Sequence, residues 1–120
     1  MILADTNAWV AHVRRSDDRL VRLLLEARIV TCAVVVGELL LGSGLPPALT
    51  DSLSRLPAVP SPSAAETVDY ISRHRKTFGA SGVGWADAQI IVAAAKAGAL
   101  VYSSDRAVRS VWKRLGFRLA

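Results

Sequence analysis

The stretch Met1-Ile-Leu-Ala-Asp5-Thr6-Asn7 joins a short apolar run to side chains that favour the start of a helix. The same arrangement recurs later, where Leu100-Val-Tyr-Ser-Ser-Asp105 is an apolar run followed by two serines and an acid. Short apolar runs that alternate with helical patterns are typical of buried parallel strands. The chain is therefore predicted to be α/β, a three-layer α/β/α domain with a short, mostly parallel sheet.

Two further acids follow apolar stretches near the expected starts of helices, Glu38 in Val36-Gly37-Glu38-Leu39 and Asp87 in Trp85-Ala86-Asp87-Ala88. In an open parallel sheet, ligands bind beyond the carboxyl ends of the strands, so the acids are expected to converge there. Carboxylates gathered in one place raise each other's pKa, and a hard divalent cation relieves their repulsion. The sequence predicts a Mg²⁺ or Mn²⁺ site whose ligands and catalytic groups are Asp5, Glu38, Asp87 and Asp105.

Each acid also has a purely structural interpretation. Asp5 and Asp105 could be helix N-caps, and Asp87 could be a first-turn acid stabilised by the helix dipole. Glu38 differs because Val34 and Leu41 are expected on its own helical face, and a carboxylate on a buried face is costly unless it is paired or metal-bound. The four acids together therefore favour a metal site.

Polar neighbours of the acids extend this candidate site. Thr6, Asn7 and Ser103 could hold a phosphate or orient a ligand carboxylate, although capping and turn formation would use the same side chains. Further along, a basic helical face is expected to contact nucleic-acid phosphates, with a merely solvated face as the alternative. This face consists of Arg106, Arg109 and Lys113.

Periodicity and turn residues predict the remaining elements. Helices are expected from Asp5 to Val13, from Ser16 to Ala27 and over 34–41, 46–56, 63–78, 85–96 and 105–115, and strands over 2–4, 28–31, 100–102 and 117–119, with at most a brief strand at 58–59. Gly42-Ser43-Gly44 is expected to stop the third helix, and Val68 to point inward from the long helix over 63–78. Trp9, Trp85 and Trp112 fit apolar stripes and are expected in the core or an interface rather than as platforms for stacked bases.

Composition narrows the class of protein. A chain of 120 residues with 52% hydrophobic and 21% charged residues is expected to form a single domain over 1–120 rather than a disordered segment. No secretory signal or apolar run of about 20 residues is readable, so no membrane association and a cytoplasmic location are expected. The net charge of +5 modestly favours a polyanionic partner. His12 and His74 are too isolated for a zinc site, and the phosphate-binding loop of nucleotide triphosphatases is missing.

The motifs Asp5-Thr6-Asn7, Glu38-Leu39-Leu40-x-Gly42, Ala86-Asp87-Ala88-x-Ile90 and Tyr102-Ser103-Ser104-Asp105, in this order, resemble a PIN-domain ribonuclease. Length and element order are similar to the VapC-type toxins of type II toxin–antitoxin pairs. The resemblance implies a Mg²⁺-dependent endoribonuclease that acts as a toxin, with Mn²⁺ also supporting activity and the four matched acids binding the metal. It further implies an RNA substrate, a small cognate antitoxin protein and a homodimer.

Two other functions remain open at this point. Related folds cut DNA flaps, so the chain could be a structure-specific DNA nuclease, although it has no room for the extra segments that such enzymes use. It could also be a non-catalytic module that binds RNA or a protein partner, although the presence of all four acids argues against a degenerate site.

Overall fold

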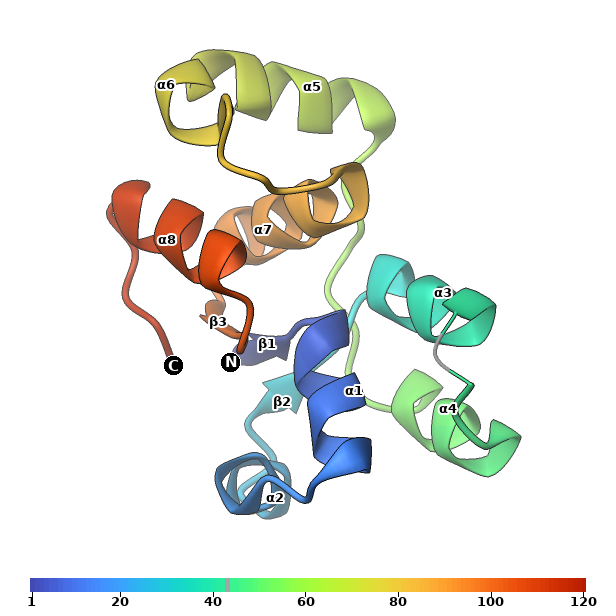
Figure 1. Cartoon of the computed structure of the whole chain (residues 1–120). Helices are drawn as coiled ribbons and strands as arrows, with labels where there is room; N and C mark the ends of the chain where they lie inside the picture. The colour runs from blue at the N-terminus through green and yellow to red at the C-terminus, as the bar shows by residue number, and fades with distance from the viewer. Residues whose placement is uncertain (43) are drawn as a thin grey trace.

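A parallel three-stranded sheet forms the centre of the computed structural model, which describes residues 1–42 and 44–120 (Figure 1). The strand order is β2-β1-β3, with β1 at Ile2–Ala4, β2 at Ile29–Val30 and β3 at Leu100–Tyr102. Both neighbours of β1 run parallel to it, as predicted. The carboxyl ends of β1 and β3 therefore lie side by side.

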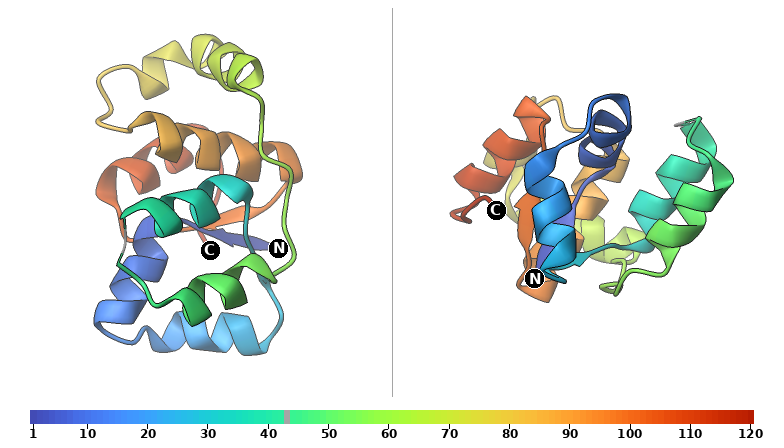
Figure 2. Two further views of the ribbon diagram at one scale, coloured as in Figure 1. Left: turned by 90° about the vertical axis from the view of Figure 1, so that its right-hand side faces the viewer. Right: turned by 90° about the horizontal axis from the view of Figure 1, so that it is seen from below.

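Helices surround this sheet and give the predicted three-layer α/β/α architecture (Figures 1 and 2). The helices are α1 (Thr6–Arg14), α2 (Asp18–Leu25), α3 (Ala33–Gly42), α4 (Pro47–Ser54), α5 (Ala64–Arg73), α6 (Arg75–Phe78), α7 (Trp85–Ala97) and α8 (Arg106–Arg114). Among the described residues, no helix is long and apolar enough to cross a membrane.

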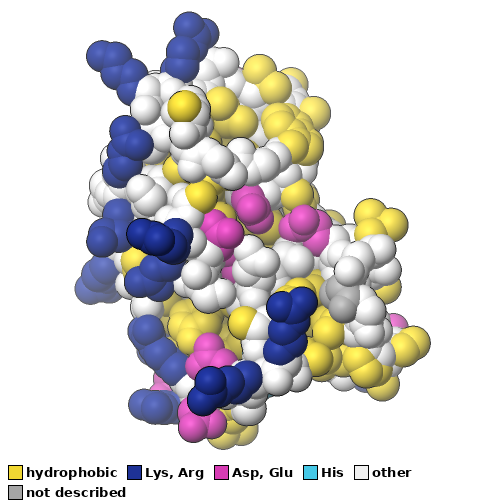
Figure 3. Space-filling model, in the orientation of Figure 1, with side chains coloured by type: hydrophobic (Ala, Val, Ile, Leu, Met, Phe, Trp, Pro, Cys, Tyr) yellow, Lys and Arg dark blue, Asp and Glu magenta, His cyan; other side chains and the backbone are white. Residues whose placement is uncertain are grey.

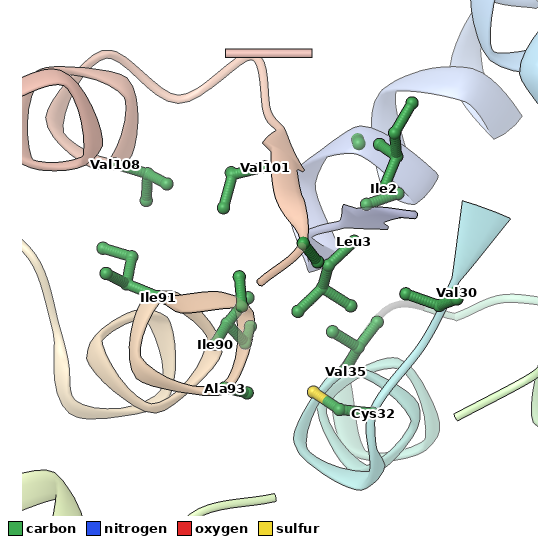
Figure 4. Close-up of a cluster of buried hydrophobic side chains, with 14 of the residues drawn as sticks. Ile2, Leu3, Val30, Cys32, Val35, Ile90, Ile91, Ala93, Val101 and Val108 are labelled. Atoms are coloured by element: carbon green, nitrogen blue, oxygen red, sulfur yellow. The ribbon is translucent and has the colours of Figure 1, made fainter. Parts of the chain in front are cut away.

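The main core lies between the sheet and helices α3 and α7. Figure 4 shows Leu3 pointing from β1 toward Ile90 of α7 and Val35 of α3, while Ile2 points to the opposite side of the sheet. Such alternation follows from the two-residue period of a strand, and both faces are buried because helices cover each of them. Complete burial of side chains of this size stabilises the fold by about 1.5–3 kcal/mol each.

The predicted long helix over 63–78 is broken at His74, which separates α5 from α6. Val68, predicted to point inward, is 53% exposed, whereas its neighbour Thr67 is fully buried. The buried face of α5 continues from Thr67 through Tyr70 and Ile71, the i+3 and i+4 positions. Val68 follows Thr67 in the chain and therefore points away from the buried face, so the prediction that it points inward was wrong.

Three smaller expectations also need correction. Phe117–Leu119 is not a strand, because only Leu119 forms a single parallel bridge with Val101. Ala27, the predicted end of the second helix, is exposed with φ 54° after α2 has ended at Leu25. Gly42 lies within α3 rather than after it, and Ser43 of the predicted stop lies outside the described residues.

Candidate active site

Asp5 connects the end of β1 to the start of α1. Its backbone N–H donates to the carbonyl oxygen of Tyr102 at 3.1 Å, which ties it to the end of β3. One carboxylate oxygen caps α1 by accepting the N–H of Ala8 at 2.8 Å, and the other accepts the hydroxyl of Ser103. Asp5 is completely buried. It is therefore the predicted N-cap, and its carboxylate also reaches the neighbouring strand.

Asp105 has a similar position at the start of α8. Its Oδ1 accepts the N–H of Val108 at 2.9 Å, and its Oδ2 accepts the side-chain amide of Asn7 at 3.3 Å. The Ser103 hydroxyl oxygen accepts the backbone N–H of Asp105 at 3.0 Å, in addition to donating to Asp5. One serine thus links the two capping acids, which come from opposite ends of the chain.

Glu38 comes from the middle of α3, not from its start. The buried face of α3 is formed by Val35 and Leu39, whereas Leu41, which was expected on the inner face, is 90% exposed. Glu38 is half-buried, so its expected place on a buried face was wrong. Its Oε1 accepts the hydroxyl of Thr6 at 2.6 Å, and this contact brings α3 to the start of α1.

Asp87 is the third residue of α7, in the first turn as the structural interpretation required. The N-cap of α7 is Gly84, whose position supplies no side-chain cap. Within residues 1–42 and 44–120, no group donates a hydrogen bond to the Asp87 carboxylate, which is half-buried. Of the four acids, Asp87 is thus the one whose carboxylate oxygens accept no hydrogen bond from the described residues.

Burial and mutual repulsion both act on these carboxylates. Burial raises the pKa of Asp5 to about 6, against the lowering effect of the hydrogen bonds from Ser103 and Ala8, and the negative charges of Asp87 and Asp105 raise it further. Burial also raises the pKa of Asp87, and Glu38 and Asp105 add to that rise. The expected repulsion between carboxylates is therefore present, but burial makes the larger contribution to both raised pKa values.

The donor set fits a hard cation, with one restriction. Among the described residues, no three Asp, Glu, His or Cys side chains are close enough to hold a metal ion by themselves. Mg²⁺ keeps several waters and usually binds through one or two carboxylates, so it does not need such a tight group. Figure 3 shows acidic side chains gathered near the centre of one face, with Lys and Arg side chains along one edge of it. The arrangement suits a partly hydrated divalent cation.

The polar neighbours contact the acids as expected, and Ser103 also has the alternative turn role, since its hydroxyl accepts the backbone N–H of Asp105. Thr6, Asn7 and Ser103 each donate a hydrogen bond to one acid of the site. On α8, Arg106, Arg109 and Lys113 form an exposed face, and Arg109 donates to the backbone oxygen of Ser103 at 3.1 Å. Sequence reasoning missed this last contact, for which the only signal was a basic residue one turn after the Asp105 cap.

The histidines and tryptophans lie outside the acidic site, in contacts or burial of their own. His12 accepts the backbone N–H of Asp17 at 2.9 Å, and the His74 ring lies 4.5 Å from that of Tyr70. Trp9 and Trp112 are buried as expected. Trp85 is 48% exposed, so it does not lie in the core, and its expected place in an interface stays a prediction.

Comparison with known proteins agrees with this geometry. The PIN-domain pattern matches residues 2–113, a span that contains all four acids. The chain belongs to the PIN-domain family. Ribonuclease VapC32 of Mycobacterium tuberculosis, from strains CDC 1551 / Oshkosh and ATCC 25618 / H37Rv, is 32% identical over 122 residues, which covers the whole chain and 97% of the relative. The predicted class, a VapC-type endoribonuclease of the PIN family, is confirmed by these two findings.

Proposed function

We propose that this VapC-type protein hydrolyses RNA phosphodiesters at a Mg²⁺ or Mn²⁺ site held by Asp5, Glu38, Asp87 and Asp105. The main support is that the acids from β1–α1, α3, α7 and the start of α8 lie near enough to interact through hydrogen bonds or charge, at the carboxyl end of the sheet. When bound, a divalent cation lowers the pKa of a coordinated water and neutralises charge on the scissile phosphate.

The protein's own contribution is to hold the ligands in place. Thr6 fixes one oxygen of Glu38, Ser103 fixes Asp5, and Asn7 reaches Asp105. Partners that orient metal ligands typically change metal affinity 10- to 100-fold when they are removed. Each carboxylate oxygen can accept more than one contact, so these hydrogen bonds leave lone pairs for a cation or its waters. Asp87, which has no hydrogen-bond donor in the described part of the chain, is the acid most available for direct coordination.

Protonation also links the site to pH. Because the pKa of Asp5 lies at about 6 without metal, a bound cation must displace its proton below that pH. Metal affinity and cleavage are therefore expected to fall together as the pH is lowered through 6.

Cleavage of RNA in the presence and absence of chelator tests this proposal. Purified protein with Mn²⁺ should cut single-stranded RNA, should stop when chelator is added, and should leave single-stranded DNA of the same sequence intact. Preference for the DNA strand would instead support the DNA nuclease alternative. No cleavage of either strand at any Mn²⁺ concentration would leave the non-catalytic binding module as the better description.

The basic face of α8 is proposed to contact RNA phosphates. Arg106 and Lys113 are exposed and have no protein partner among the described residues, whereas Arg109 also supports the Ser103 backbone. Replacing Arg106 and Lys113 together by alanine should therefore weaken RNA binding and reduce the slope of log K against log salt by about 0.7 per lost contact. The slope is measured with a non-cleaving Asp87→Asn background.

Arg28 offers a matched control for this measurement. It lies just before β2, at the amino end of the parallel strands, whereas the acids lie at the carboxyl end. Its guanidinium pairs with Glu26 at 3.6 Å. Arg28→Ala should leave the salt slope unchanged. Equal slopes for the double variant and the wild type would assign the α8 face to solvent.

A partner protein and a second copy are proposed as well. The resemblance to VapC toxins implies a small antitoxin and a homodimer, and the exposed Leu40 and Leu41 at the end of α3 provide apolar surface for association. Light scattering should give the mass of a dimer, and a co-expressed small protein should abolish cleavage. A monomer that stays active when small candidate antitoxin proteins are co-expressed with it would contradict both the dimer and the antitoxin.

A cytoplasmic location stays a prediction.

A further inference from the structure

An apolar pocket lies at the first turn of α7, the turn that also holds Asp87. Its volume is about 260 Å³, slightly below the roughly 300 Å³ of the smallest sites for drug-sized ligands. The side chains that matter most in its lining are Ile71, Arg75, Phe78, Val83, Trp85 and Ala88. Such a pocket has room for one planar ring system and not for a folded segment of protein.

Trp85 is the unusual member of this lining. It is 48% exposed, while Trp9 and Trp112 are almost completely buried. Trp85 and Ala88 share one face of α7, whereas Asp87, two residues from Trp85, lies on a different side of the same turn. The pocket and the carboxylate thus belong to the same helical turn, so one bound strand can contact both.

The surroundings of the pocket favour an anionic ligand. Arg75 lines the pocket, no acid does, and the backbone oxygen of Lys76 accepts Arg114 of α8 at 3.2 Å. The cations of α6 therefore continue into those of α8, and Figure 3 shows Lys and Arg side chains along this edge of the face. A ligand that presents a flat apolar ring on an anionic backbone matches both features, and unpaired nucleotides are such ligands.

We propose that this pocket binds an unpaired base of the RNA, stacked on Trp85, while Arg75 contacts the base or its phosphate. The inference rests on the proposed function, since it assigns part of the substrate to a place next to the acidic site. Sequence-specific RNA recognition commonly splays out single-stranded bases and stacks them on aromatic side chains or on Arg planes. The pocket would then select which nucleotide lies near the cleaved phosphate.

Tryptophan fluorescence in the presence of chelator tests the pocket without any cleavage. Because Trp85 is the exposed tryptophan, a short oligoadenylate should quench its emission, whereas inorganic polyphosphate, which has no bases, should not. By anisotropy with a labelled oligoadenylate, Trp85→Ala should bind about tenfold more weakly or worse, and Trp85→Phe should retain most of the affinity. Val68→Ala is the matched control, since Val68 is exposed on the neighbouring helix but does not line the pocket.

Several results would overturn the inference. Equal quenching by polyphosphate, or unchanged oligoadenylate affinity in Trp85→Ala, would remove the base from the pocket. A halved mass of Trp85→Ala in light scattering with unchanged RNA affinity would make the pocket an interface between two copies. A wild type that cuts RNA with Mn²⁺ while Trp85→Ala cuts with the same kcat/KM would overturn the pocket and leave the proposed function intact. If the wild type binds oligoadenylate through Trp85 but never cuts, the proposed function fails and the pocket stands.

Discussion

Replacing Asp87 by asparagine is expected to lower single-turnover RNA cleavage at least about a hundredfold, because loss of a direct ligand should exceed the 10- to 100-fold effect of losing an orienting partner. Asp87 makes no protein hydrogen bond among the described residues, and burial raises its pKa. The metal-free variant should consequently be at least as stable as the wild type. The measurements are cleavage with saturating Mn²⁺ and a melting curve with chelator.

Asp69 provides the control for this variant. It is an exposed aspartate on α5 that pairs with Arg73 at 3.0 Å, away from the acidic site. Asp69→Asn should cut RNA at the wild-type rate. If Asp87→Asn also cuts at that rate but melts at a lower temperature, Asp87 is a structural acid of the first helical turn and not a ligand.

The metal-free protein is expected to lose stability as the pH rises through the range set by Asp5. The folded pKa of about 6 lies above the ordinary aspartate value of 3.8, so the folded state binds more protons between these two pH values. The contribution of Asp5 is fully present below 3.8 and is lost as the pH passes 6. At about 1.4 kcal/mol per pKa unit, the loss amounts to at most about 3 kcal/mol.

Asparagine at position 5 isolates this contribution from all other titrating groups. Asp5→Asn can still cap α1 through Ala8 but has no charge to bury, so with chelator above pH 6 its free energy of unfolding should exceed that of the wild type. Below pH 4 this advantage should vanish. The difference is read from urea unfolding at both pH values, and an advantage that does not change with pH would contradict the assigned burial cost.

Alanine and manganese give two further comparisons at the same position. Asp5→Ala should be less stable than Asp5→Asn at every pH, because a lost N-cap costs about 1 kcal/mol. Mn²⁺ at ten times its dissociation constant should stabilise the wild type by about 1.4 kcal/mol and should stabilise both variants less.

The sequence predicted those parts of the site that depend only on residues nearby in the chain. Asp5 and Asp105 each follow a strand and cap a helix, and both events are encoded within a few residues. Glu38 shows where this reasoning fails. An apolar helix does not reveal which face is buried, and the real face passes through Val35 and Leu39 rather than through Val34 and Leu41.

The remaining features depend on contacts between distant segments. Thr6 and Glu38 are 32 residues apart, and Ser103 and Asp5 are 98 apart, so no local pattern could pair them. Periodicity also does not encode the break at His74 or the exposure of Trp85, which lie where α5 packs against α7 and α6 against α8. Apolar runs and helix starts grouped the four acids in the sequence, and the tertiary contacts supplied their hydrogen-bond partners.

Direct binding of Mn²⁺ tests the central claim that the four acids form one cation site. Calorimetric titration of the wild type should show Mn²⁺ binding that weakens in each of Asp5→Asn, Glu38→Gln, Asp87→Asn and Asp105→Asn and is retained in Asp69→Asn. A titration in which the four variants bind Mn²⁺ as tightly as Asp69→Asn and the wild type would contradict the account.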